Sequence, residues 1–150
     1  MTYHAGAAAY KNMEVTSSNR LKIIIMVYDA AIASLKEAVE THQRHDYLKR
    51  NQYISRAQSI IFELNNALDM KNGGDIADNL RKLYHFLNRH LGDALTSDSL
   101  AAIEQSVHIL ETLREAWQAI AESRNAGLNA DTTGAVYHGR PPQAAAGGST

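Results

Sequence analysis

Histidines and acidic residues give this sequence its main capacity for chemistry. A carboxylate-bridged metal centre in a helical bundle needs Glu-x-x-His pairs, and no glutamate here has a histidine three positions later. His42 and His45 are spaced to share a weak surface metal, but solvated side chains near a helix end are the favoured interpretation. His85 and His90 are five positions apart and diverge on a helix, so they cannot chelate one ion. We predict no metal site.

Phosphoryl transfer is a second chemistry that four-helix bundles support, through one exposed histidine. That class typically has Lys and Gly three and four positions after the histidine, and neither His85 nor His108 is followed by that pair. The sequence also lacks the phosphate-binding pattern GxxxxGK[ST], the nucleophile pattern G-x-S-x-G and all cysteines. We therefore predict no catalytic residue and no cofactor. A helical signalling adapter or histidine phosphotransfer module stays as the alternative.

Helical periodicity dominates from about residue 18 to 124, and no stretch alternates in the manner of a strand. Gly73-Gly74 should end the second helix, and the polar run 96–99 should cap the fourth. Because the connections are short, successive helices should be antiparallel neighbours. The fold class predicted is all-α, an antiparallel up-down four-helix bundle. Its helices should cover about 18–42, 47–70, 75–94 and 100–124.

The large apolar residues of each predicted helix form one stripe, which should face the core. In the first helix the stripe comprises Leu21, Ile24, Ile25, Tyr28, Ile32, Leu35 and Val39. In the second it comprises Ile54, Ala57, Ile61, Leu64 and Leu68. In the third it comprises Ile76, Leu80, Leu83, Leu87, Leu91 and Ala94. In the fourth it comprises Leu100, Ile103, Val107, Leu110, Leu113, Trp117 and Ile120.

The sequence divides into three parts. Residues 18–124 form the predicted bundle domain. Residues 1–17 lack strong periodicity and are predicted to be a flexible segment that caps a groove. Residues 125–150 are rich in Gly, Ala, Thr and Pro and hold few large apolar groups, so they cannot offset the entropy of ordering. We predict that this tail is disordered.

The first helix carries apolar residues on a second face. Ile23, Met26, Val27 and Ala30 point away from its core stripe, and Phe62 lies off the stripe of the second helix. A solvated helix surface does not need such residues, so something should cover them. Two interpretations remain: the molecule covers this face itself, or the face is a groove for an amphipathic partner helix.

The two interpretations are compatible. The segment from Tyr10 to Val15 would cover the second face until a partner displaces it. Asp29 adjoins Tyr28 at the edge of the apolar stretch, where its carboxylate should accept a hydrogen bond from another helix or from a partner's backbone amide.

Charge and hydropathy exclude several classes of partner. The formal net charge is −1, with 15 Lys and Arg against 16 Asp and Glu, which gives no electrostatic basis for binding nucleic acid. The N-terminus does not have the pattern of a secretory signal, and the longest apolar run, 23–28, is far below the roughly 20 residues of a membrane helix. We expect a cytoplasmic protein without membrane insertion.

Four stretches, in order and nearly without gaps from about residue 10 to 122, are similar to one family. They are Tyr10–Thr16 with Leu21 and Ile25–Ala31; Ala57–Leu64; Gly73–Leu80 with Leu83-Tyr84; and Leu113–Trp117. Together they resemble the flagellin export chaperone family, FliS. The family often has Ser-Pro at the start of the first helix and Gly after Tyr-Asp, where this chain has Ser18-Asn19 and Ala30.

The resemblance implies a non-enzymatic function. Members of this family are four-helix bundles that bind the C-terminal segment of flagellin, hide its polymerising surface and aid delivery to the flagellar export apparatus. The resemblance associates Tyr10 with flagellin binding and places Tyr84 in a shared stretch. A weak homodimer stays open as a further assembly. The predicted flagellin-binding residues are Tyr10, Val15, Ile23, Met26, Val27, Tyr28, Asp29, Ala30, Phe62 and Tyr84.

Overall fold

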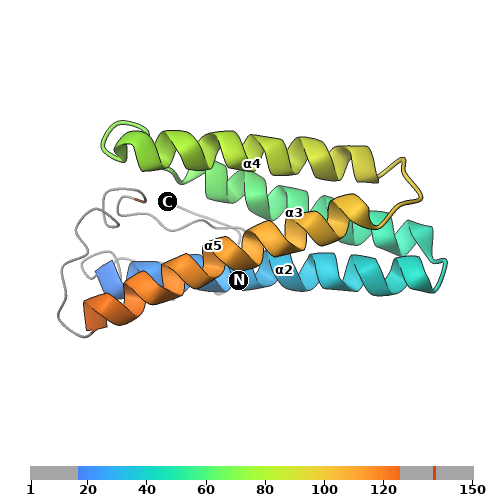
Figure 1. The fold of residues 1–150 in the computed structure, drawn as a ribbon, viewed down its shortest axis with the longest axis horizontal. Coiled ribbons are helices and arrows are strands. Elements are labelled where there is room, and N and C mark those ends of the chain that lie inside the picture. Colours follow the sequence, from blue (N-terminus) through green and yellow to red (C-terminus); the bar gives the residue numbers. More distant parts are fainter. Residues whose placement is uncertain (1–16, 126–136, 138–150) are drawn as a thin grey trace, which may run out of the picture.

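Four α-helices arranged around one core form the part of the chain that the structure describes (Figure 1). The structure is a computed structural model, and it describes residues 17–125 and residue 137. Residues 1–16, 126–136 and 138–150 lie outside this description, so the predictions for the N-terminal segment and for most of the tail stay predictions. The helices are α2 (Ser17–Gln43), α3 (Tyr47–Asn66), α4 (Gly74–Ala94) and α5 (Ala101–Asn125).

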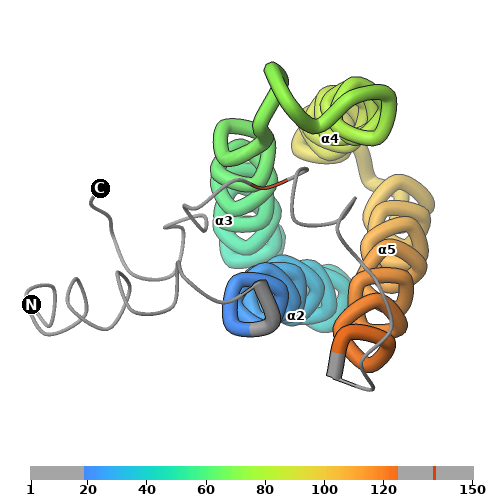
Figure 2. Tube along the Cα trace, turned by 90° about the vertical axis from the view of Figure 1, so that its left-hand side faces the viewer, coloured from blue at the N-terminus to red at the C-terminus, as the bar shows by residue number. Residues whose placement is uncertain are grey.

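Viewed along its length, the molecule places the helices in a ring in the order α2, α3, α4, α5 (Figure 2). Hydrogen bonds show that α3 and α4 are antiparallel: Gln58 of α3 donates to the Asn88 carbonyl of α4, and the later Asn65 lies beside the earlier His85. The prediction of an all-α four-helix bundle is therefore confirmed. Helices α4 and α5 lie closest near the 95–100 connection and diverge toward the C-terminal end of α5 (Figures 1 and 2).

Local polar contacts set the helix ends. The Asp46 side chain accepts a hydrogen bond from the Lys49 backbone amide and caps the first turn of α3. The Ser99 hydroxyl accepts one from the Ala101 amide at the start of α5, as the predicted polar cap requires. These side chains satisfy amides that have no carbonyl partner within the first helical turn.

The end of the second helix differs from the prediction. Helix α3 ends at Asn66, before residue 70, because the Asp69 carboxylate accepts hydrogen bonds from the amides of Lys71 and Asn72 and holds a turn there. Gly73-Gly74 therefore begins α4 and does not end α3. Gly74 has a φ of 60°, a conformation that other residues rarely adopt.

The predicted core stripes are mostly buried, although several members, Leu83 and Leu113 among them, are only half-buried. Two further corrections concern α4. Ile76 is exposed, and Tyr84, which the stripe omitted, is fully buried. The buried stripe of α4 begins instead at Ala77 and continues at spacings of three and four residues. Its other members are Leu80, Tyr84, Leu87, Leu91 and Ala94.

Candidate partner-binding surface

Helix α2 packs against two neighbours, and this determines which of its residues reach the surface. On one flank the Ser34 hydroxyl donates to the Tyr53 carbonyl of α3 at 2.8 Å. On the other flank Lys36 pairs with Glu111 of α5 at 3.0 Å between Nζ and Oε2. A helix held on two sides buries a wider arc than one stripe, so part of its predicted second face belongs to the core.

The predicted exposure of Val27 is therefore wrong. The prediction placed it on the outer face, but only 3% of it is exposed. Val27 lies on the same flank as Ser34, the flank that contacts α3. Ile23 and Ala30 are half-buried and pack against the core at the edge of this flank. Among the four apolar residues of the predicted second face, Met26 alone, 62% exposed, projects into solvent as predicted.

Phe62 is exposed, in agreement with its position off the core stripe. Its exposed fraction is 56%. Gln58 and Asn65, on the same side of α3, reach across to Asn88 and His85 of α4. Phe62 lies between them at the spacings i+4 and i+7, so it lies along the outer edge of the contact between α3 and α4. Met26 and Phe62 therefore belong to different faces of the bundle.

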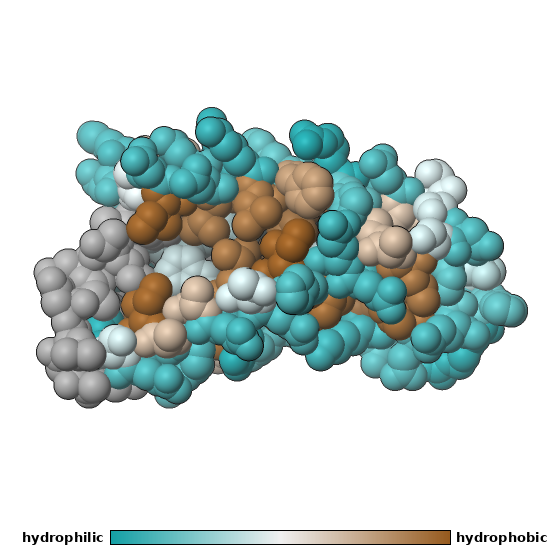
Figure 3. Space-filling model, viewed as in Figure 1, coloured by the Kyte–Doolittle hydropathy of each residue, from teal (hydrophilic) through white to brown (hydrophobic). Residues whose placement is uncertain are grey.

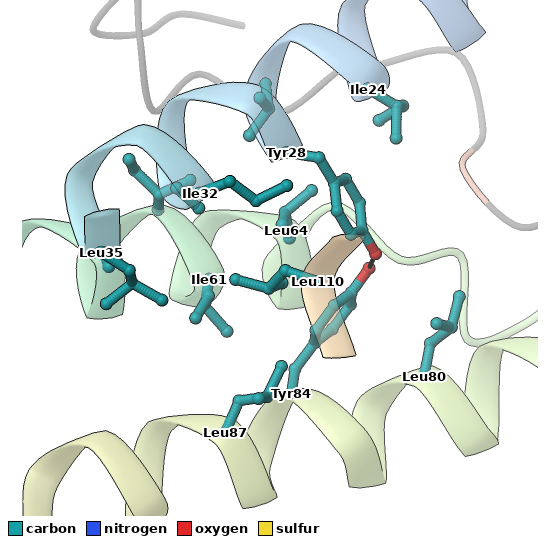
Figure 4. Close-up of a cluster of buried hydrophobic side chains, with 14 of the residues drawn as sticks. Ile24, Tyr28, Ile32, Leu35, Ile61, Leu64, Leu80, Tyr84, Leu87 and Leu110 are labelled. Atoms are coloured by element: carbon teal, nitrogen blue, oxygen red, sulfur yellow. Dashed lines mark hydrogen bonds between the residues drawn. The ribbon is translucent and has the colours of Figure 1, made fainter. Parts of the chain in front are cut away.

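Tyr28 and Tyr84 meet inside the bundle and are not surface residues. Their hydroxyl oxygens are 2.5 Å apart, and both side chains are fully buried (Figure 4). Burial raises the pKa of Tyr28 to about 12, while hydrogen bonding from Tyr84 lowers it in part. Burial also raises the pKa of Tyr84 well above its usual value. At neutral pH both phenols are uncharged and join α2 to α4 through their hydroxyls.

Asp29 does accept hydrogen bonds from another helix. Its carboxylate oxygens lie 2.6 and 3.3 Å from Nε and Nη2 of Arg114 on α5. The same contact raises the pKa of the Arg114 guanidinium. Both side chains remain partly exposed, so this ion pair lies at the rim of the contact between α2 and α5.

The face between α4 and α5 is an apolar surface that was not among the predicted binding surfaces. Leu83 and Phe86 of α4 and Ile109 and Leu113 of α5 are only half-buried against the core. Figure 3 shows apolar residues gathered between polar rims on this face. We call these four residues the α4–α5 groove. Phe86 and Ile109 lie off the predicted stripes, as Phe62 does. A large apolar residue off the core stripe is visible in the sequence, so these two positions could have been predicted.

One end of the α4–α5 groove is closed by polar contacts. His90 and Gln105 lie 2.7 Å apart where the two helices are close, and the His90 ring stacks on Phe86 at 5.0 Å between centroids. Toward the other end the helices diverge (Figure 1). The groove therefore widens from the 95–100 connection toward the buried tyrosines.

Other kinds of site are not evident within 17–125. No three His, Asp or Glu side chains in the described ranges are grouped to hold a metal ion. Among the described helices, none is long and apolar enough to cross a membrane. Two predicted binding residues, Tyr10 and Val15, lie outside the described residues.

Comparisons with known proteins agree with the fold. The family described as "Flagellar protein FliS" matches residues 2–124. The "Flagellar secretion chaperone FliS" of Salmonella typhimurium is 31% identical over 122 residues, covering 78% of this chain and 90% of that protein. The protein of the same name from Vibrio cholerae is 28% identical over 116 residues, covering 75% and 85%. That of Bacillus subtilis is 23% identical over 117 residues, covering 77% and 86%. The resemblance predicted from the sequence is confirmed, and the chain belongs to the FliS family of flagellar secretion chaperones.

Proposed function

We propose that this chain is a cytoplasmic export chaperone that binds the C-terminal segment of flagellin. It keeps that segment from polymerising and delivers it to the flagellar export apparatus. The family supports the chaperone role, because the matched relatives are named flagellar secretion chaperones. One structural observation carries the proposal: a bundle with a closed core leaves apolar side chains uncovered on several faces. Such surfaces mark sites of protein association.

The α4–α5 groove fits an amphipathic helix. Its apolar residues repeat along both helices, with Leu83 and Phe86 on one wall and Ile109 and Leu113 on the other. A partner helix lying along it would present apolar residues at i, i+3, i+4 and i+7 to the four groove residues. The polar pair His90 and Gln105 limits how far the partner extends toward the 95–100 connection.

Energetics favour a partner that contacts more than one face. Ordering a disordered segment costs about 2 to 5 kcal/mol, and association adds several kcal/mol of lost translational and rotational freedom. Burial returns roughly 25 cal/mol per Å² of apolar surface, so several hundred Å² must be covered. Met26 and Phe62, on separate faces, supply further apolar contacts for a segment that wraps around the bundle. Release then requires exchange for another partner at the export apparatus.

Calorimetric titration with a synthetic flagellin C-terminal peptide tests the proposal. Met26→Asp and Phe62→Asp each place a charge on an exposed apolar site and should leave the bundle folded while weakening binding by roughly tenfold, about 1.4 kcal/mol. Leu48→Asp is the matched control, since Leu48 is exposed near the start of α3, apart from both sites. Circular dichroism checks the fold of each variant.

The titration has clear opposing outcomes. A wild-type protein that does not bind the peptide rejects flagellin as the partner. Equal affinities for Met26→Asp, Phe62→Asp and Leu48→Asp reject these two positions as contacts. A groove variant, Phe86→Ser, then shows whether the α4–α5 groove alone binds the peptide.

A further inference from the structure

Tyr137 is buried inside the bundle although it follows the end of α5 by more than ten positions. Only 1% of it is exposed. Its hydroxyl lies 2.6 Å from the hydroxyl of Tyr84, which in turn bonds to Tyr28. Its ring lies 5.6 Å from the Trp117 ring, with the planes tilted by 60°. Tyr137 belongs to the tail predicted to be disordered, and this contact was not predicted.

The slot that holds Tyr137 is built from three helices. Tyr28 comes from α2, Tyr84 from α4 and Trp117 from α5, and these three residues define what we call the aromatic slot. It offers an aromatic wall and a hydroxyl partner, which together suit a phenol ring with its polar tip. Burial raises the pKa of Tyr137 well above its usual value, so the phenol is neutral there.

The aromatic slot also holds a polar group without a full partner. The indole N–H of Trp117 is close enough to Tyr28 to lower the pKa of its hydroxyl. Its Nε1 is nevertheless buried, and no acceptor among residues 17–125 and 137 meets it with hydrogen-bond geometry. Tyr137 therefore fills the slot but leaves the Trp117 indole N–H without an acceptor in the described part of the chain. An incoming chain that places a carbonyl or hydroxyl oxygen there would gain a hydrogen bond.

The slot lies at the open end of the α4–α5 groove. Trp117 follows the groove residue Leu113 by one helical turn, and Tyr84 adjoins Leu83. A helix that lies along the groove toward its wide end therefore reaches the position of Tyr137. The two cannot occupy the same space.

We propose that the chain's own Tyr137 occupies the aromatic slot and competes with the flagellin segment for the open end of the groove. This inference rests on the proposed function for the identity of the competitor. Tyr137 is the only Phe, Trp or Tyr in residues 126–150. Its described contacts are the Trp117 ring, the Tyr84 hydroxyl and the surrounding core, against the entropy of constraining the chain between Asn125 and Tyr137. A single buried residue is displaced by a partner that makes many contacts along the groove.

Trp117 allows a direct test, because it is the only tryptophan in the chain. In the full-length protein, Tyr137→Ala should shift Trp117 emission to longer wavelength, as water enters the emptied slot. Tyr137→Phe, which keeps the ring, should leave the emission near that of wild type. Tyr47→Ala is the control, since Tyr47 lies at the start of α3, far along the chain from all three slot residues.

Binding measurements on the same variants test competition. Removing a competing occupant should strengthen binding of the flagellin peptide by roughly threefold to tenfold in Tyr137→Ala, with Tyr47→Ala unchanged. A synthetic peptide of residues 132–142, added to Tyr137→Ala, should restore the wild-type emission and weaken binding of the flagellin peptide.

The outcomes separate this inference from the proposed function. Unchanged Trp117 emission in Tyr137→Ala shows that Tyr137 does not occupy the slot. A changed emission with equal or weaker flagellin binding shows that Tyr137 is a structural residue and not a competitor. If no variant binds the flagellin peptide, the proposed function fails, while the emission and the 132–142 peptide still decide whether the slot takes up Tyr137.

Discussion

The Arg50 side chain donates a hydrogen bond of 2.7 Å to the backbone carbonyl of Ser97, across 47 positions of sequence. It also donates to the carbonyls of Ala94 and Leu95, although only 2% of Arg50 is exposed. These carbonyls lie at the end of α4 and in the connection just after it, where the helix dipole is negative and the carbonyls have no partners within the helix. A buried cation from the start of α3 therefore caps the end of α4.

Replacing Arg50 should destabilise the protein strongly. Arg50→Met removes one donor from each of the carbonyls of Ala94, Leu95 and Ser97 and should lower the free energy of unfolding by about 3 kcal/mol. Asn51 still donates to the Leu95 carbonyl, and the Ser97 amide still donates to that of Ala94. Arg50→Lys keeps the charge but not the planar set of donors, so we expect about half that loss. Urea unfolding measures both losses, and the dependence of the free energy of unfolding on urea concentration should stay the same in all three proteins.

Arg56→Met is the matched control for Arg50. Arg56 lies on the same helix but is exposed, so its replacement should change the free energy of unfolding by less than about 0.5 kcal/mol. Similar losses for the two variants would contradict the capping role of Arg50.

The ion pair of Asp29 and Arg114 should contribute little to stability. Its distances are short, 2.6 and 3.3 Å, but both side chains are partly exposed and screened by solvent. Asp29→Asn should therefore lower the free energy of unfolding by less than about 1 kcal/mol. A double-mutant cycle with Arg114→Met isolates the pair, and its coupling should shrink in about 1 M salt. A coupling that is large and independent of salt would contradict this assignment.

The sequence predicted the bundle because each helix repeats its apolar residues with a helical period. Ile54, Ala57, Ile61 and Leu64 of α3 are all buried, as one stripe requires. Helix ends were less predictable where a side chain, and not the expected glycine pair, sets the turn after the helix. The Asp69 carboxylate accepts hydrogen bonds from the amides of Lys71 and Asn72 and holds the turn after α3, which the glycines four positions later did not reveal.

The candidate site was only partly predictable, because exposure depends on how many helices surround each one. Met26 and Phe62 are exposed as expected, whereas Val27 is buried by its contact with α3. A helical wheel gives the direction of each side chain around one helix, but it does not show which directions are covered by neighbouring helices. The contact of Tyr137 with Tyr84 depends on tertiary structure alone, since nothing in the composition of residues 125–150 favours burial.

Adjacent residues on α2 should respond in opposite ways to the same substitution. Val27→Asp buries an unpaired carboxylate against α3 and should unfold the bundle or lower its free energy of unfolding by more than about 3 kcal/mol. Met26→Asp places the same group in solvent and should change it by less than about 0.5 kcal/mol. Thermal unfolding followed by circular dichroism compares them. Equal stabilities would show that α2 does not pack on α3 through the flank that holds Val27.

Alkaline pH should destabilise the fold through its buried phenols. Burial raises the pKa of Tyr28 from 10.0 to about 12, although the hydrogen bond with Tyr84 and the nearby indole N–H of Trp117 lower it in part. The folded protein therefore keeps this proton over a pH range in which the unfolded chain loses it. The contribution to stability is complete below pH 10 and is lost as the pH rises from about 10 to about 12.

Tyr28→Phe tests this alkaline dependence directly. The variant loses the hydroxyl contact with Tyr84, so it should be less stable than wild type at pH 8. Its stability should then fall less steeply above pH 10, because one raised phenol pKa has been removed. Tyr84 and Tyr137 also have raised pKa values, so part of the dependence should persist. Urea midpoints at pH 8, 9, 10 and 11 measure the two slopes; parallel slopes would show that the Tyr28 phenol is not held neutral by burial.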